Sequence, residues 1–254
     1  MPIFTLAKYT IKGYIKERIL LVVLIFAFLL MAASYVMSPL AVGAQQKIVI
    51  DIGLAAIPLF GILLIVLLGA GTFYQEKQHG ILKGLLAKPI TRADFVLGKW
   101  LGTVLTVVLV MTLMAAVYLM AMWLSGAAFS ATLFLSIYLS MFEIALIAAV
   151  LSFFSSFTSP VLASFFTICT AAAGHLSKDL LAFADRIDAA APKFLAHAAY
   201  YTLPNLGLFN VREEAVHGIA LQEGFITTVT VYGLFYTAVL LFLSAIIFRF
   251  KEIS

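Results

Sequence analysis

Charged residues are scarce in this chain. Lys, Arg, Asp and Glu make up only 11% of its 254 residues, whereas 64% are hydrophobic and the mean hydropathy is +1.12. A soluble domain contains about 25% charged residues, so a water-soluble globular fold is excluded. Intrinsic disorder is excluded as well, because it requires low hydrophobicity together with high net charge. The composition leaves an integral membrane protein.

Cysteine and the common catalytic motifs are also scarce or missing. The single Cys169 allows no internal disulfide and no cysteine-based zinc or haem site. The sequence has no His-Glu-x-x-His, no Gly-x-Ser-x-Gly and no P-loop, because Gly98-Lys99 is followed by Trp100 and position 93 is Ala. We therefore assign no catalytic residue, no metal site and no nucleotide site to this chain. The net charge of +4 comes from basic residues that flank apolar runs, which favours topology signals and lipid contact over nucleic-acid binding.

The sequence contains six long apolar runs. A helix needs about 20 apolar residues to cross a bilayer, whereas a barrel would show alternating segments of about ten residues. The fifth of six runs is short, but Ser159 can cap its helix and Pro160 suits a first turn. We predict an all-α polytopic membrane protein, a single transmembrane domain over 1–254, with spans at Ile19–Met37, Ile52–Phe73, Trp100–Leu124, Ser130–Phe154, Pro160–Leu176 and Phe225–Phe248.

The first run is longer than the apolar region of a cleavable signal peptide, which spans about 7–15 residues. We therefore expect it to be a retained first span, although the small residues Val42-Gly43-Ala44 leave cleavage open.

Lys and Arg are distributed unevenly across these spans. With six spans both termini share one side, and eleven of the sixteen Lys and Arg residues fall on that side. The positive-inside rule places this side in the cytoplasm. The segment 177–224 then faces outside, where its acidic residues outnumber its basic ones. We expect a multi-pass protein of the inner (plasma) membrane with both termini in the cytoplasm.

Two flanking segments have helical patterns of their own. Lys8, Lys12 and Lys16 recur every four residues beside an apolar face, so we predict that residues 1–18 form an interfacial helix on the cytoplasmic head groups; an ordinary basic flank is the alternative. In 177–224 we predict one helix from Ser177 to about Ala190 and a second short piece between Pro192 and Pro204. Both are expected to rest at the outer surface of the bundle.

The cytoplasmic segment 74–99, between the second and third spans, is amphipathic. Its apolar residues Ile81, Leu82, Leu85 and Leu86 are spaced as on one face of a short helix, which is typical of a docking element. Pro89 disfavours helix at the preceding residue, and Thr91 with Asp94 favours a new helix start. The sequence therefore predicts a long second helix, a short transverse helix and a long third helix.

This segment resembles the intracellular loop of ABC type-2 permeases, the membrane subunits of ABC exporters whose ATPase is a separate chain. The matching residues are Glu76, Gly80-Ile81-Leu82, Leu85-Leu86-Ala87-Lys88-Pro89-Ile90-Thr91-Arg92, Phe95-Val96 and Gly98-Lys99. The run Tyr200-Tyr201-Thr202-Leu203-Pro204-Asn205 with Phe209-Asn210 is similar to the multicopper-enzyme-maturation branch, which includes the nitrous-oxide-reductase maturation permease. The resemblance covers the whole chain and is more specific for the superfamily than for a substrate.

The resemblance implies a mechanism and an assembly. The helix over about 80–87 is similar to the coupling helix that seats in a cleft of the ATPase, with an acidic position before it and a basic position after it. The implied interface residues are Glu76, Gly80, Ile81, Leu82, Leu85, Leu86, Pro89 and Arg92. Two permeases would assemble with two ATPases, which bind ATP and Mg; this chain itself would need no cofactor and would not be an enzyme.

One acidic residue lies deep within a predicted span. Glu143 is near the middle of the fourth run, where a charge costs about 2.5–3.5 kcal/mol on insertion scales. Ser136, Ser140 and Glu143 fall at i, i+4 and i+7, hence on one helix face. These three residues line a substrate path or gate in one interpretation. In the other, Glu143 only makes a hydrogen bond to a neighbouring helix.

Two other classes of function stay open at this point. An ATP-independent channel or carrier would work without any ATPase. A membrane enzyme or assembly scaffold would use the outer helices to recruit an extracytoplasmic protein. An exporter can have such a protein as an accessory partner. An ATPase encoded in the neighbouring reading frame would favour the exporter.

Overall fold

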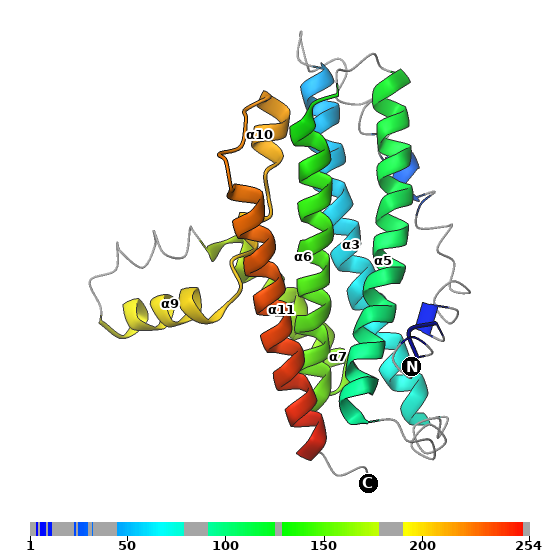
Figure 1. Ribbon diagram of the computed structural model, residues 1–254, viewed down its shortest axis with the longest axis vertical. Helices are drawn as coiled ribbons and strands as arrows, with labels where there is room; N and C mark the ends of the chain where they lie inside the picture. Colours follow the sequence, from blue (N-terminus) through cyan, green and yellow to red (C-terminus); the bar gives the residue numbers. More distant parts are fainter. Residues whose placement is uncertain are drawn as a thin grey trace.

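The computed structural model describes residues 4, 6–8, 10–11, 23, 25–29, 32, 45–78, 91–124, 129–177 and 190–250. All regular elements in these ranges are helices, which confirms the all-helical class. Four of them are long and apolar enough to cross a membrane, and they lie side by side in an elongated bundle (Figure 1). These are α3 (Gln45–Gln78), α5 (Arg92–Leu124), α6 (Ala131–Phe157) and α11 (Phe225–Phe250). Most of the predicted first span, 19–37, lies outside the described residues.

The predicted fifth span is a shorter helix, α7 (Pro160–His175). Its 16 residues amount to about 24 Å at 1.5 Å per residue, which is less than the hydrocarbon core of about 30 Å. Pro160 occupies the first turn as expected, and Ser159 is the cap residue, although its side chain makes no capping hydrogen bond. The C-terminal part contains α9 (Ala190–Thr202), a 3-10 helix η1 (Leu206–Leu208) and α10 (Arg212–His217).

Helix α6 forms the centre of the bundle. Of the residues in its most apolar stretch, 67% are buried, compared with 22% for α11. It contacts α3, α5, α7, α10 and α11. Close packing depends on small residues: a Cβ added to Gly61 of α3 would lie 2.8 Å from the Ile144 side chain. Such small residues let transmembrane helices approach one another closely.

The described N-terminal residues lie against the beginning of α5. Leu6 and Ala7 are buried, whereas Phe4 is 65% exposed. A Cβ added to Gly102 of α5 would lie 2.6 Å from Cβ of Thr10, so this glycine makes room for the N-terminal segment. The role of residues 1–18 as an interfacial helix stays a prediction.

The placement of α9 differs from what we expected. A helix is present between Pro192 and Pro204, but it leaves the bundle near half of its height and not at the end that we predict to be outside (Figure 1). The reason is that the end of α9 is held at this level by α11, since the Asn205 backbone N–H donates to the Tyr232 hydroxyl and the Tyr236 hydroxyl donates to the Thr202 carbonyl. The other predicted outer helix, Ser177 to about Ala190, lies mostly outside the described residues.

Candidate functional site

The predicted coupling residues lie at, or between, the ends of two long helices. Glu76 belongs to the last turns of α3, and Arg92 is the first residue of α5. The other six fall outside the described residues: Gly80, Ile81, Leu82, Leu85, Leu86 and Pro89. Helices α3 and α5 contact each other and contain 34 and 33 residues. At about 50 Å each, both exceed a hydrocarbon core of about 30 Å.

The start of α5 is fixed by a reciprocal cap, as the sequence predicted. The backbone N–H of Asp94 donates to the Thr91 hydroxyl at 3.1 Å. In return, the Thr91 hydroxyl and backbone N–H donate to the Asp94 carboxylate at 2.7 and 3.2 Å. Such a cap satisfies donors that a helix start otherwise leaves unpaired. Helix α5 therefore begins at a defined residue, directly after Thr91.

A tryptophan near the start of α5 connects this helix to the centre of the bundle. The Trp100 indole N–H donates to the carbonyl of Ala145 on α6 at 3.0 Å. Ala145 is two residues from Glu143 along α6. This hydrogen bond joins the N-terminal part of α5 to the part of α6 that carries the buried acid.

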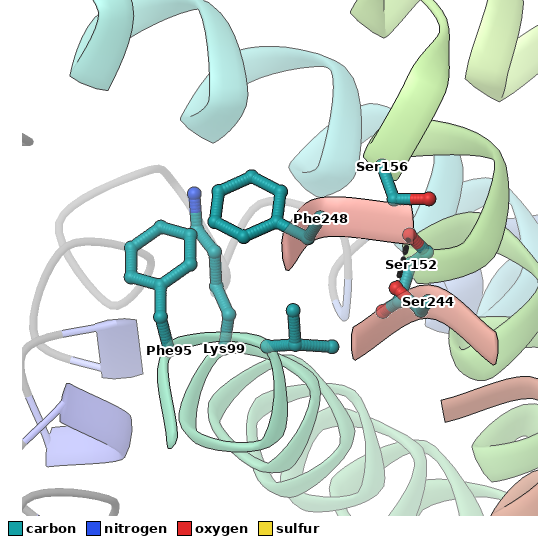
Figure 2. Close-up of a pocket in the computed structure, with 7 residues that line it drawn as sticks. Phe95, Lys99, Ser152, Ser156, Ser244 and Phe248 are labelled. Carbon is teal, nitrogen blue, oxygen red and sulfur yellow. Dashed lines mark hydrogen bonds between the residues drawn. The ribbon is translucent and has the colours of Figure 1, made fainter. Parts of the chain in front are cut away.

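A small pocket lies where the ends of α6 and α11 meet the beginning of α5 (Figure 2). Phe95 and Phe248 stack with centroids 5.6 Å apart, and the buried Lys99 places its ammonium 5.6 Å from the Phe95 centroid. The Ser244 hydroxyl donates across to the carbonyl of Ser152 at 3.1 Å. We assign these serines a packing role, since small polar residues join transmembrane helices closely.

The three polar residues predicted on the fourth span do share one buried face of α6. Ser136, Ser140 and Glu143 are 4%, 6% and 1% exposed. The Ser140 hydroxyl donates to the Ser136 carbonyl at 2.9 Å. The structure adds a partner from another helix: Nε2 of His175, the last residue of α7, lies 2.8 Å from Oε1 of Glu143.

The Glu143–His175 pair has one closed side and one open side. The Glu143 side chain is 2% exposed, whereas that of His175 is 34% exposed. The His175 ring lies within ion-pairing distance of Oε1 of Glu143, although no donor among the described residues is well aligned with this oxygen. The described residues also contain no cluster of three metal-ligating side chains. The pair therefore joins the middle of α6 to the end of α7.

A turn from the C-terminal part of the chain holds the end of α7. The Ser177 hydroxyl donates to the Asn205 side chain at 2.8 Å, and the Asn205 backbone N–H donates to the Tyr232 hydroxyl of α11 at 2.9 Å. Gly174 allows the close approach, because an added Cβ would lie 2.6 Å from the carbonyl oxygen of Pro204. His175 is thus positioned by α11 through this turn.

Sequence reasoning missed His175 as a site residue. Its position at the end of an apolar run was the available signal, because an ionisable residue within a membrane segment implies a polar partner. The run from Tyr200 to Asn205, which resembles the multicopper-enzyme-maturation branch, includes Pro204 and Asn205 of this turn. Phe209 of the same motif is buried and packs against Gly233 of α11.

The fold and the site define a multi-span helical membrane protein with an intramembrane acid and a loop between two long helices. The family model described as ABC-2 family transporter protein matches residues 16–172, which is more than half of the chain. The chain therefore belongs to the ABC-2 transporter family. A comparison with curated proteins finds no match.

The matched range includes the loop, Trp100 and Glu143, but it ends before His175. The class of the protein is thus a transporter component of the membrane.

Proposed function

We propose that this chain is the membrane-spanning permease subunit of an ATP-driven ABC exporter. A separate cytoplasmic chain binds ATP and Mg and hydrolyses the nucleotide. The observation that carries this proposal is the pair of helices α3 and α5, both longer than a bilayer core, which contact each other and flank the amphipathic loop. Family membership supports it, and these 254 residues contain no P-loop of their own.

The loop transmits movement of the ATPase to the bundle. Its apolar face, Ile81, Leu82, Leu85 and Leu86, seats in a groove of the ATPase. Closure of the ATPase displaces the start of α5, which the cap at Thr91 keeps helical. Trp100 passes this displacement to α6. The polar face of Ser136, Ser140 and Glu143 then acts as the substrate path or gate. This path opens when the contact between Glu143 and His175 breaks.

The assembly contains two permeases and two ATPases in the inner membrane, with both termini of the permease in the cytoplasm. Closed two-fold symmetry is the commonest arrangement of oligomers. An extracytoplasmic accessory protein is an additional partner. Within the family, the run from Tyr200 to Asn205 supports a place in the multicopper-enzyme-maturation branch.

A test replaces the apolar residues of the loop with acids. We expect Leu85→Asp or Leu86→Asp to abolish co-purification of the ATPase from native membranes, since a charge would be buried in the groove, while membrane insertion is unchanged. Lys83→Asp is the matched control, because Lys83 lies on the opposite side of the same predicted helix and should keep the ATPase bound.

If both leucine variants retain the ATPase, this loop is not the coupling element. If the native protein purifies without any ATPase and still transports, the function is that of a channel or carrier.

A further inference from the structure

Helix α7 covers only part of the central helix α6. It contains 16 residues, whereas α6 contains 27, and its last residue, His175, faces Glu143 near the middle of α6. The chain that returns after α9 continues from this level: η1 contacts α7, and α10 contacts α3 and α6. Figure 1 shows α10 beside the beginnings of α3 and α6, at the end that we predict to be outside. The segment 205–217 thus lies between the Glu143–His175 pair and this outer end.

One side of this segment is apolar and packs into the bundle. Leu206, Phe209 and Val211 are each 1% exposed, and Ala215 is 4% exposed. A Cβ added to Gly233 of α11 would lie 2.8 Å from the Phe209 ring, so this glycine makes room for the aromatic side chain. Because close-packed apolar side chains leave few voids that could hold water, the segment separates the interior of the bundle from the outside.

The same segment is joined to α3 by an ion pair. Nε of Arg212 on α10 lies 2.8 Å from Oδ1 of Asp51 in the second turn of α3, and the two side chains are 34% and 47% exposed. The hydroxyl of Tyr118 on α5 holds the neighbouring carbonyl of Ile50. Ion pairs that face water are weak and are screened by salt, so this contact can open and close without unfolding either helix.

The connection from α10 to α11 has the features of a hinge. Gly218 ends α10 with a φ of 67°, and Gly224 precedes α11 with a φ of 81°, both in the left-handed region that glycine adopts without strain. A Cβ added at either position would meet no atom within 4 Å, and residues 218–220 and 222–224 are exposed. Exposed segments with few packing contacts open at low cost in free energy.

We propose that residues 205–217 form an outer gate, and that the ion pair between Arg212 and Asp51 is its latch. Displacement of α10 about the two hinge glycines separates the ion pair and opens the polar face of α6 toward the outside. This inference rests on the proposed path along α6 and adds the element that closes it. The family model matches Asp51 but ends before Arg212, so the latch joins the matched part of the chain to the part beyond it.

The experiment measures how fast a thiol on the path reacts from the outside. Ser136→Cys is introduced into the full chain with Cys169→Ser, and intact spheroplasts are exposed to a membrane-impermeant, cationic methanethiosulfonate reagent. Ser136 is 4% exposed and lies seven residues, or about 10 Å, from Glu143 toward the beginning of α6. With the gate closed, this thiol should react slowly.

Charge reversal on either side of the latch should raise the labelling rate. We expect Asp51→Arg and Arg212→Asp each to raise it about five-fold, which corresponds to the loss of an exposed ion pair at the upper end of its usual strength. The exchanged pair, with both substitutions, should return the rate to that of the starting chain. The two single variants change the local charge in opposite directions, so an effect on the approach of the cationic reagent alone would have opposite signs.

Glu213→Arg is the matched control, because it reverses an exposed charge on the same helix and should leave the labelling rate unchanged. Asp51→Asn keeps the shape of the side chain and should give a smaller rise than Asp51→Arg, since it removes the attraction without adding repulsion. The latch is refuted by unchanged rates in both charge-reversal variants, by opposite changes in the two, or by a lack of recovery in the exchanged pair.

Co-purification of the ATPase from the same membranes separates this inference from the proposed function. A bound ATPase together with unchanged labelling rates would refute the latch and leave the exporter intact. Faster labelling that the exchanged pair reverses, without a bound ATPase, would support the latch in a channel or carrier and count against the exporter.

Discussion

At the scale of single residues, the contact between Glu143 and His175 bears on both interpretations of the buried acid. The carboxylate is buried and has a partner on α7, as a packing role requires. The partner, however, is one-third exposed and is held by a turn that α11 positions. The open side at His175 is where a transported molecule would reach the pair in the proposed mechanism.

Removal of one partner should destabilise the protein more than removal of both. We expect His175→Ala to cost about 1–3 kcal/mol, because it leaves the buried carboxylate of Glu143 without its partner. The double variant with Glu143→Gln should recover part of this loss. Thermal unfolding of the purified chain and its two single and one double variants measures the coupling. Additive changes in Tm would show that the two side chains do not interact.

The Glu143 variant can also be tested for function, by measuring ATP turnover of the assembled complex. Glu143→Gln retains the shape of the side chain, so assembly with the ATPase should be unchanged while transport-coupled ATP turnover is altered. Ser152→Ala, which changes a packing serine on the same helix, is the control. Unchanged turnover in Glu143→Gln would favour the packing role.

At the scale of helices, the sequence predicted the helix starts, because residues close together in the chain determine them. The start of α5 follows from Thr91 and Asp94, three residues apart, and the start of α7 follows from Pro160. The contact between Glu143 and His175 could not be predicted, since it depends on where α7 ends relative to a residue 32 positions earlier. The level of α9 was missed for the same reason: it is set by Tyr232 and Tyr236 on a distant helix.

The close approach between α7 and the turn makes Gly174 sensitive to substitution. Helix propensity alone predicts that Gly174→Ala stabilises α7 by roughly 1 kcal/mol. The added Cβ would however lie 2.6 Å from the carbonyl oxygen of Pro204, a backbone atom, and overpacking costs about 1–3 kcal/mol. We expect a lower Tm. The control Val161→Ile adds one methyl group at an exposed position of α7 and should change Tm little. A raised Tm in Gly174→Ala would contradict the packing of this turn.

At the scale of the whole molecule, the two ends of the bundle differ. At one end α3 and α5 flank the predicted coupling loop. At the other end the beginning of α3 is held by two contacts: Arg212 of α10 lies 2.8 Å from Asp51, and the Tyr118 hydroxyl donates to the Ile50 carbonyl at 3.3 Å. The Glu143–His175 pair lies between these ends. In the proposed mechanism, a movement that starts at the loop reaches the part of α6 that carries the pair through the hydrogen bond of Trp100.

This sequence of events requires the loop to lie in the cytoplasm, and the distribution of Lys and Arg predicts that it does. Single-cysteine variants in a Cys169→Ser chain can test the orientation at exposed positions: Lys8→Cys beside the N-terminus, and Glu213→Cys on α10. In intact spheroplasts an impermeant maleimide should label position 213, and it should label position 8 only after the membrane is permeabilised. The reverse pattern would place the loop outside, where no cytoplasmic ATPase can bind it, and the proposed function would fail together with the orientation.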